Sequence, residues 1–249
     1  MLKNILFICF TFLLFTSANA QEAIFNACKT GDLDSVKKLL ISNPALLSAK
    51  DKSGLTPLHY ASTKSLEVVM YLVDKGADVN AKSKNGATPL YSAARFGQME
   101  IAKYLLEHKA DINAKSDGGS VMHQAAYRSP KPMVELLLSY KPDLTLTDKE
   151  GRTCIHAAAI WNVDSVLQLL ITAGGDINAK DMHGNTPLHL SLTFINERSN
   201  SVSKSARVLI KNNVLLNERN NAGLTPLGLA IQKGATEMVR FLSEAGARE

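Results

Sequence analysis

The sequence has little of what marks the specialised protein classes. Its 249 residues include only three Cys, too few for a disulfide-rich scaffold. The 15 Gly and 8 Pro are too few for collagen or a low-complexity linker. Aromatic residues make up 6%, with a single Trp. The formal net charge of +5 is mild and no run of Lys and Arg concentrates it, so no nucleic-acid partner is expected.

Sequence motifs for catalysis and cofactor binding are also missing. The chain contains no phosphate-binding loop, no H-E-x-x-H, no G-x-S-x-G and no C-x-x-C, so we expect neither a cofactor nor a metal site. What is present is an ordinary globular composition, 45% hydrophobic and 20% charged, which is enough to bury a core.

The first twenty residues have the pattern of a secretory signal peptide. Lys3 gives a positive start, an apolar run extends from Ile5 to Phe15, and Ala18 and Ala20 are small residues two apart. The run is shorter than the roughly 20 residues of a membrane span, and no later segment reaches that length. We therefore expect cleavage after Ala20 and export to a periplasm or the outside; an uncleaved N-terminal anchor is the alternative.

A short motif recurs along the rest of the chain. Its six copies are Gly54-Leu-Thr-Pro-Leu-His59, Gly86-Ala-Thr-Pro-Leu-Tyr91, Gly118-Gly-Ser-Val-Met-His123, Gly151-Arg-Thr-Cys-Ile-His156, Gly184-Asn-Thr-Pro-Leu-His189 and Gly223-Leu-Thr-Pro-Leu-Gly228. Successive copies are 32, 32, 33, 33 and 39 residues apart. A second signal, such as Ala77-Asp-Val-Asn80, follows about twenty residues after each of the first five copies.

Each repeat can be interpreted physically. Gly permits a turn, Thr caps a helix, and Pro suits the first helical position. A second helix with apolar residues at helical spacing follows, such as Val68, Val69 and Leu72, and Gly76 and Gly174 end two of these helices. Neither helix could bury its apolar face alone, so neighbouring repeats must stack.

This pattern resembles the ankyrin repeat, which has about 33 residues and a T-P-L-H signature. The resemblance covers residues 22–249 and implies an all-α solenoid of paired antiparallel helices joined by β-turn fingers. We expect about six repeats after an N-terminal capping helix pair. The predicted segments are 1–20 (signal peptide), 21–50 (capping pair), and repeats 51–82, 83–114, 115–147, 148–180, 181–219 and 220–249. The extra residues of the long repeat, 196–203, are polar and predict an exposed loop between its two helices.

The histidines and cysteines are the obvious candidates for chemistry. His59, His123, His156 and His189 occupy one repeat position, so they should form a ladder and not converge on a metal ion. The resemblance implies that each one hydrogen-bonds its own capping residue. Cys28 and Cys154 are four repeats apart, too far to form a disulfide. Cys154 is expected to be a buried, inert thiol, and a Cys154/His156 nucleophile pair is the alternative.

The strongest functional signal follows the first helix of each repeat. The resemblance implies that partners dock on the finger tips and on the concave face of the first helices, where two residues per repeat project. In the middle repeats these are Arg95, Phe96, Tyr127, Arg128, Ile160, Trp161, Thr193 and Phe194. Trp, Tyr and Arg are enriched at binding hot spots. The alternative is that the aromatic rings seal the seams between repeats. Lys52, Lys84 and Lys149 on the fingers are expected only to be solvated.

The sequence therefore predicts an exported, non-catalytic, monomeric ankyrin-repeat protein. It would bind a protein partner of unknown identity through Arg95, Phe96, Tyr127, Arg128, Ile160, Trp161 and Phe194. One alternative is a periplasmic protective or chaperone-like protein that stabilises a partner enzyme. The other is a thiol enzyme centred on Cys154.

Overall fold

The computed structural model describes residues 19–128, 130–195 and 201–249, and short helices dominate it. The chain forms two compact units, unit 1 (Met1–Ala114) and unit 2 (Lys115–Glu249). The boundary between them falls on one of the predicted repeat boundaries. Strands in the described residues are limited to the two-residue pair β1 and β2, so the expected all-α repeat fold is confirmed.

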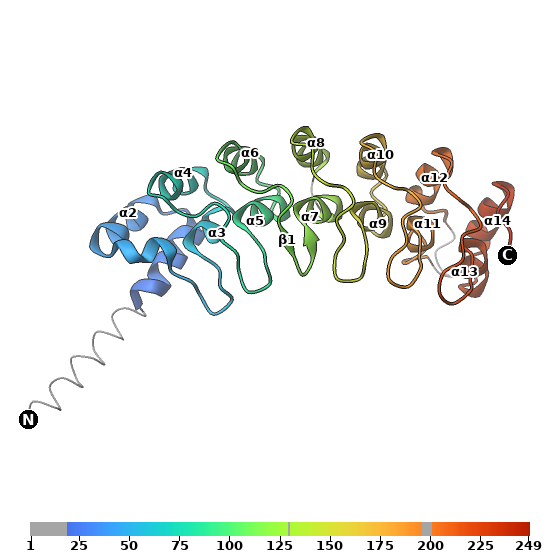
Figure 1. Ribbon diagram of the computed structural model, residues 1–249, viewed down its shortest axis with the longest axis horizontal. Helices are drawn as coiled ribbons and strands as arrows, with labels where there is room; N and C mark the ends of the chain where they lie inside the picture. The colour runs from blue at the N-terminus through green and yellow to red at the C-terminus, as the bar shows by residue number, and fades with distance from the viewer. Residues whose placement is uncertain (1–18, 129, 196–200) are drawn as a thin grey trace, which may run out of the picture. The chain divides into compact units, whose positions relative to one another are not determined.

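Unit 1 begins with a helix over residues 19–30. The helices that follow are α2 (Leu33–Ser42), the 3-10 helix η1 (Pro44–Ser48), α3 (Pro57–Ala61), α4 (Leu66–Asp74), α5 (Pro89–Arg95) and α6 (Met99–Glu107). First helix packs on first helix, α3 against α5, and second helix on second helix, α4 against α6. The finger loops project from the first-helix layer (Figure 1).

Unit 2 repeats this arrangement. Its elements are β1 (Lys115–Ser116), β2 (Gly119–Ser120), α7 (Val121–Arg128), α8 (Lys131–Ser139), α9 (Cys154–Ile160), α10 (Asp164–Thr172), α11 (Pro187–Leu190), α12 (Lys204–Lys211), α13 (Pro226–Gln232) and α14 (Thr236–Glu244). The first helices α7, α9, α11 and α13 contact one another in series, as do the second helices α8, α10 and α12 (Figure 1). We call the layer of first helices, with its fingers, the first-helix face.

The repeated motif sets where each first helix begins. Thr56, Thr88, Thr186 and Thr225 are N-cap residues in extended backbone, and a Pro occupies the following position. Thr88 accepts a hydrogen bond from the N–H of Tyr91 at 3.3 Å, as a helix cap does. Cys154 fills the Pro position of α9 and still starts a helix, because Pro is favoured but not required there and Thr153 with His156 still forms the capping box.

Small and large apolar residues alternate in the core. Leu58, Leu90, Ile155 and Leu188 point inward at the second helical position and are fully buried. Pairs of alanines follow them within the first helices: Ala93 and Ala94, Ala125 and Ala126, and Ala158 and Ala159. Since Ala has no side chain beyond Cβ, neighbouring first helices can approach closely, and each repeat contributes one thin layer to the core.

The fingers are shaped by a carboxylate and a glycine. In the first finger, Asp51 Oδ1 accepts from the N–H groups of Ser53 and Leu55, both at 2.8 Å. Asp148 and Asp181 make the same two bonds in later fingers. These self-contained turns shape the three fingers that begin with Asp51, Asp148 and Asp181 without help from a neighbouring repeat.

Two of the finger glycines, Gly54 and Gly151, have a second role at the next repeat. Gly54 and Gly151 have φ of +78° and +73°, which favours glycine. A Cβ on Gly54 would lie 2.9 Å from the backbone N of Lys84, and one on Gly151 would lie 2.9 Å from that of Met182. Those two N–H groups donate to the carbonyls of Ser53 and Glu150, respectively. The glycine therefore makes room for the hydrogen bond that joins one finger to the next.

The long repeat corrects one expectation. The extra residues do lie between α11, which ends at Leu190, and α12, which begins at Lys204; residues 196–200 are outside the described part. The predicted exposed loop extended to Ser203, but Ser203 is only 1% exposed. Its hydroxyl donates to Asn162 Oδ1 at 3.0 Å, and the N–H of Ser205 donates to the same oxygen at 2.8 Å. These bonds fix the start of α12 on the preceding repeat.

The predicted signal peptide lies outside the described residues except for its last two positions. Residues 19 and 20 belong to the helix over 19–30, so cleavage after Ala20 would shorten that helix by two residues. Within residues 19–249, where the structure describes them, no helix has both the length and the apolar character needed to cross a membrane.

Substituting the finger glycines tests their two roles separately. Gly151→Ala should lower the free energy of unfolding by more than the roughly 1–2 kcal/mol that a positive φ costs a non-glycine residue, because its Cβ also collides with Met182. Gly223→Ala is the matched control, since Gly223 has a similar φ of +76° and nothing within 4 Å of a built Cβ. Urea unfolding measures both, and equal losses would contradict the close-approach role.

Candidate functional site

The four histidines of the repeat motif each connect a helix cap to the next finger. On one side, Nδ1 accepts from the backbone N–H of the capping Thr or Ser at 3.1–3.2 Å. On the other side, Nε2 lies 2.8–3.1 Å from a carbonyl oxygen of the following finger. The pairs are His59 with Ala87, His123 with Arg152, His156 with Asn185, and His189 with Leu224.

These partners determine the protonation state of the rings. Because Nδ1 accepts from an N–H group and Nε2 faces a carbonyl oxygen, we assign the neutral Nε2–H tautomer to all four. Burial lowers the pKa of each of the four imidazoles below the ordinary value of 6.5. Both ring nitrogens are thus engaged in binding the protein's own backbone.

No metal site emerges from this arrangement. Among the residues that the structure describes, no group of three or more His, Cys, Asp or Glu side chains is placed to hold a metal ion. The expected bond from each histidine to its own capping residue is present; the second bond, to the next finger, was not expected from the sequence.

Cys154 is poorly placed for nucleophilic chemistry. It is a free, buried thiol, and burial raises its pKa to about 12. Its Sγ lies 4.0 Å from the carbonyl oxygen of Leu144, whereas both ring nitrogens of His156 bind elsewhere. The sequence alternative of a Cys154/His156 pair therefore lacks its base. Cys28 is also free and buried, and burial raises its pKa to about 12.

The predicted aromatic residues of unit 2 contact one another in series. The ring centroids of Tyr127 and Trp161 are 4.4 Å apart, and those of Trp161 and Phe194 are 5.4 Å apart. The three residues come from the end of α7, the C-cap of α9 and the turn after α11. We call Tyr127, Trp161 and Phe194 the aromatic stripe.

The geometry of the stripe bears on both alternatives that the sequence analysis left open, a seam between repeats and a binding surface. The ring contacts join adjacent repeats, as a seam would. Yet Trp161 remains 37% exposed and Phe194 60% exposed, although both are large and apolar. Contact between neighbouring rings holds their orientation while leaving surface uncovered. A row of oriented, solvent-facing aromatic rings is the kind of surface that binds a partner.

Ile160 is partly buried, and the side chain of Arg128 lies outside the described residues. Ile231 was missed by the sequence analysis: it is exposed and lines a groove of 730 Å³ together with Phe194. Lys233 occupies the same repeat position as Trp161 and Phe194. Its Nζ is not free, because it donates hydrogen bonds to the carbonyls of Leu192 and Thr193.

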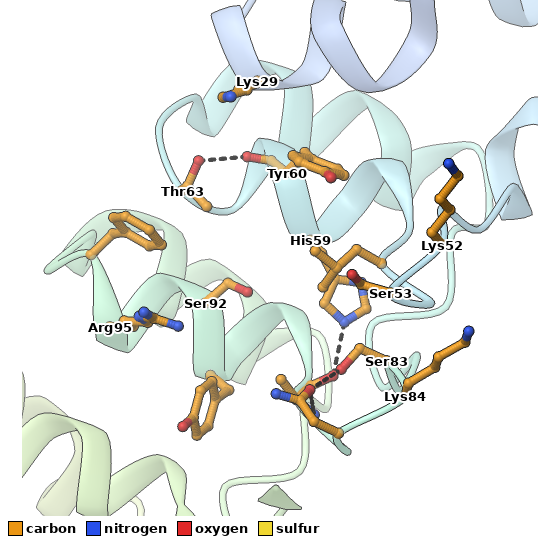
Figure 2. A pocket seen from close by; sticks show the side chains of 15 residues that line it. Lys29, Lys52, Ser53, His59, Tyr60, Thr63, Ser83, Lys84, Ser92 and Arg95 are labelled. Carbon is orange, nitrogen blue, oxygen red and sulfur yellow. Dashed lines mark hydrogen bonds between the residues drawn. The ribbon is translucent and has the colours of Figure 1, made fainter. Parts of the chain in front are cut away.

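In unit 1 the predicted residues Arg95 and Phe96 line a groove of 660 Å³ (Figure 2). Both side chains are exposed, and the Arg95 guanidinium carbon lies 5.9 Å from the centroid of the Phe96 ring. The groove lies on the first-helix face of this unit, between the fingers that begin at Asp51 and Ser83 and the helices α3 and α5.

The groove also contains cations that the sequence analysis set aside. Lys52 and Lys84, which were expected only to be solvated, line it together with Lys29 and Arg95. The sequence did contain an indication of this positive charge: Lys52 and Lys84 follow Asp51 and Ser83, at the same position of successive fingers. Lys29, in the capping helix, has no counterpart in the repeat pattern, so only the fold brings it here.

A comparison with family models gives one match. The model of ankyrin repeats (three copies) matches residues 6–83, 24–116, 80–148 and 122–203, which together span residues 6–203. Residues 204–249 lie beyond the matched ranges and continue the same helix pairs, α12 to α14.

The neutral histidines make stability depend on pH. The folded chain resists protonation at these rings, whereas the unfolded chain takes up protons near the ordinary pKa of 6.5. The free energy of unfolding should therefore be fully retained above that pH and should decline as the pH falls below it. Urea titrations at a series of pH values measure the slope.

Removing one ring tests the assignment. In His156→Gln the side-chain amide can still donate to the Asn185 carbonyl, but it no longer titrates. The variant should be less stable near neutral pH, and its free energy of unfolding should fall less steeply as the pH drops below the ordinary histidine pKa. An unchanged slope would show that other groups cause the pH dependence.

Proposed function

The chain belongs to the ankyrin-repeat family, whose members generally mediate protein–protein interaction, and we propose that it binds a protein partner through its first-helix face. In unit 2 the contact surface is the aromatic stripe, extended by Ile231. In unit 1 it is the groove lined by Arg95 and Phe96. Recognition depends on surface that the fold presents in fixed positions, so little side-chain ordering is needed on binding.

The observation that carries this proposal is the exposure of the stripe. Trp161, the single Trp of the chain, lies between Tyr127 and Phe194 and keeps over a third of its surface in water. Its position at the end of a first helix is the same as that of Phe96. Large aromatic side chains that are ordered in the free protein lose little entropy when a partner covers them.

A binding role without catalysis is consistent with the family, which is typically non-catalytic. The groups that could act as nucleophile and base, Cys154 and His156, are buried and separately engaged. A thiol whose pKa is raised to about 12 is almost entirely protonated near neutral pH and reacts slowly.

Truncating the stripe tests the proposal. The full chain is used to capture partners from an extract of its own source cells, and the affinity of the captured protein is then measured by titration. Trp161→Ala with Phe194→Ala should weaken that affinity by about 2 kcal/mol or more, as for hot-spot residues. The free energy of unfolding should fall only by the ring contacts, about 0.5–1.5 kcal/mol each.

Tyr140→Ala is the matched control. Tyr140 is 36% exposed, close to the exposure of Trp161, but it caps the second helix α8 and so lies off the first-helix face. Its removal should leave the affinity unchanged. If both variants bind as well as the unmodified chain, or lose affinity equally, the stripe is not the contact surface.

We also propose that the chain is exported by its first twenty residues. The support is the sequence pattern of Lys3, the apolar run from Ile5 to Phe15, and the small residues Ala18 and Ala20. Fusion of residues 1–20 to a reporter enzyme that is active only outside the cytoplasm should give activity. Placing Arg at Leu13 and Leu14 should abolish it, and the N-terminus of the exported chain should be Gln21. A reporter that stays inactive would contradict export.

A further inference from the structure

The groove of unit 1 carries a concentration of positive charge from four separate places in the sequence. Lys29 comes from the helix over 19–30, Lys52 and Lys84 from two successive fingers, and Arg95 from the end of α5. Figure 2 shows these four side chains around the groove, with His59 and Ser83 near the finger bases. None of the groove-lining residues is Asp or Glu.

These four cations are not neutralised by the protein itself. In the part of the chain that the structure describes, none of them is within 4.0 Å of a carboxylate oxygen, and all four are exposed. Other cations do find partners: Arg152 pairs with Asp148 at 2.9 Å and Lys180 with Glu218 at 2.8 Å. The groove thus brings together four cations that lack a carboxylate partner among the described residues.

Carboxylates near the groove offset part of its positive charge, and Asp51 is the first of them. It lies in the first finger and accepts from the hydroxyl of Tyr60, a groove-lining residue, at 2.8 Å. Its other oxygen accepts from two backbone N–H groups. Asp78 also acts electrostatically on the groove-lining His59, as does the cation Lys50. Even when Asp51 and Asp78 are both counted in full against the four groove cations, two positive charges remain in excess.

The groove also offers apolar and hydrogen-bonding surface. Leu55, Tyr91 and Phe96 supply apolar contacts, and the fingers are held together there by the bond from the Lys84 N–H to the Ser53 carbonyl at 2.9 Å. That bond holds the backbone at Ser53 and Lys84. It therefore fixes where the side chains of Lys84 and of Lys52, the residue before Ser53, begin. A ligand that fits must be anionic at several points and must present some apolar surface between them.

We propose that this groove binds an acidic segment of a partner protein, with Asp or Glu carboxylates facing Lys29, Lys52, Lys84 and Arg95. The inference rests on the proposed function, protein binding, and specifies the chemistry of the partner at unit 1. Charge complementarity is its basis: unpaired cations gain most from an opposite charge and steer its approach. Four cations are fewer than the roughly six to ten phosphate contacts that nucleic-acid binders make, which favours a peptide.

The probe is a fluorescein-labelled peptide of repeated Glu-Glu-Leu units, titrated with the full chain and followed by fluorescence anisotropy. Binding should be saturable and should be lost at high salt, where the Debye length shrinks to about 3 Å. Lys52→Glu with Lys84→Glu should weaken binding about tenfold or more. A peptide of repeated Lys-Lys-Leu units should not bind.

A charge-matched control separates the groove from the overall charge of the chain. Lys149→Glu with Lys103→Glu makes the same change in net charge, but Lys149 lies on a finger of unit 2 and Lys103 on the second helix α6. This variant should bind the acidic peptide as the unmodified chain does. Equal loss in the two variants would overturn the proposal.

Other outcomes are also decisive. Lys29→Gln with Arg95→Gln provides a second groove variant that reverses no charge, and it should weaken binding as well. A single-stranded oligonucleotide of equal charge that bound more tightly than the peptide would overturn the proposal in favour of nucleic acid. The stripe variant Trp161→Ala with Phe194→Ala should leave peptide binding unchanged. If it loses partner capture while the acidic peptide fails to bind the unmodified chain, the groove inference fails and the proposed function stands.

Discussion

The hydrogen bond from a histidine to the next finger is the interaction on which the regularity of this structure depends. It fixes the distance between one helix cap and a backbone carbonyl about thirty residues later in the sequence. The same ring also holds the start of its own helix. One side chain therefore sets both where a helix begins and where the next finger lies, and the bond between successive fingers acts alongside it.

A surface for binding follows from this scaffold because the positions it does not use are free to differ. The interior positions of the first helices are filled by Leu, Ile, Val, Met and Ala, whereas Phe96, Trp161 and Phe194, at or after the ends of these helices, are exposed. In unit 2 the residues of the stripe are aromatic and touch in series; in unit 1 the corresponding Arg95 and Phe96 flank a groove rich in lysine. The same repeat architecture thus presents an apolar surface in unit 2 and a positively charged surface in unit 1.

The sequence predicted the elements whose causes are local. The caps at Thr56 and Thr88, the helix-ending Gly76 and Gly174, and the bond from each histidine to its own cap depend on neighbours within a few residues. The outward position of Trp161 and Phe194 followed from the repeat register. What the sequence could not supply were the partners brought near by stacking: the carbonyl that faces each Nε2, the anchor of Ser203 on Asn162, the exposed Ile231, and Lys29 in the same groove as Lys52.

The anchor of α12 also bears on how the chain can change in length. Ser203 and Ser205 bind Asn162, so α12 packs on α10 although its repeat is longer than the others by about six residues. The spacing of the helices is therefore independent of the number of residues between α11 and that anchor. Evolution, or a protein engineer, can lengthen or replace this segment while the repeats on both sides keep their register, which makes it the natural place to graft a foreign peptide.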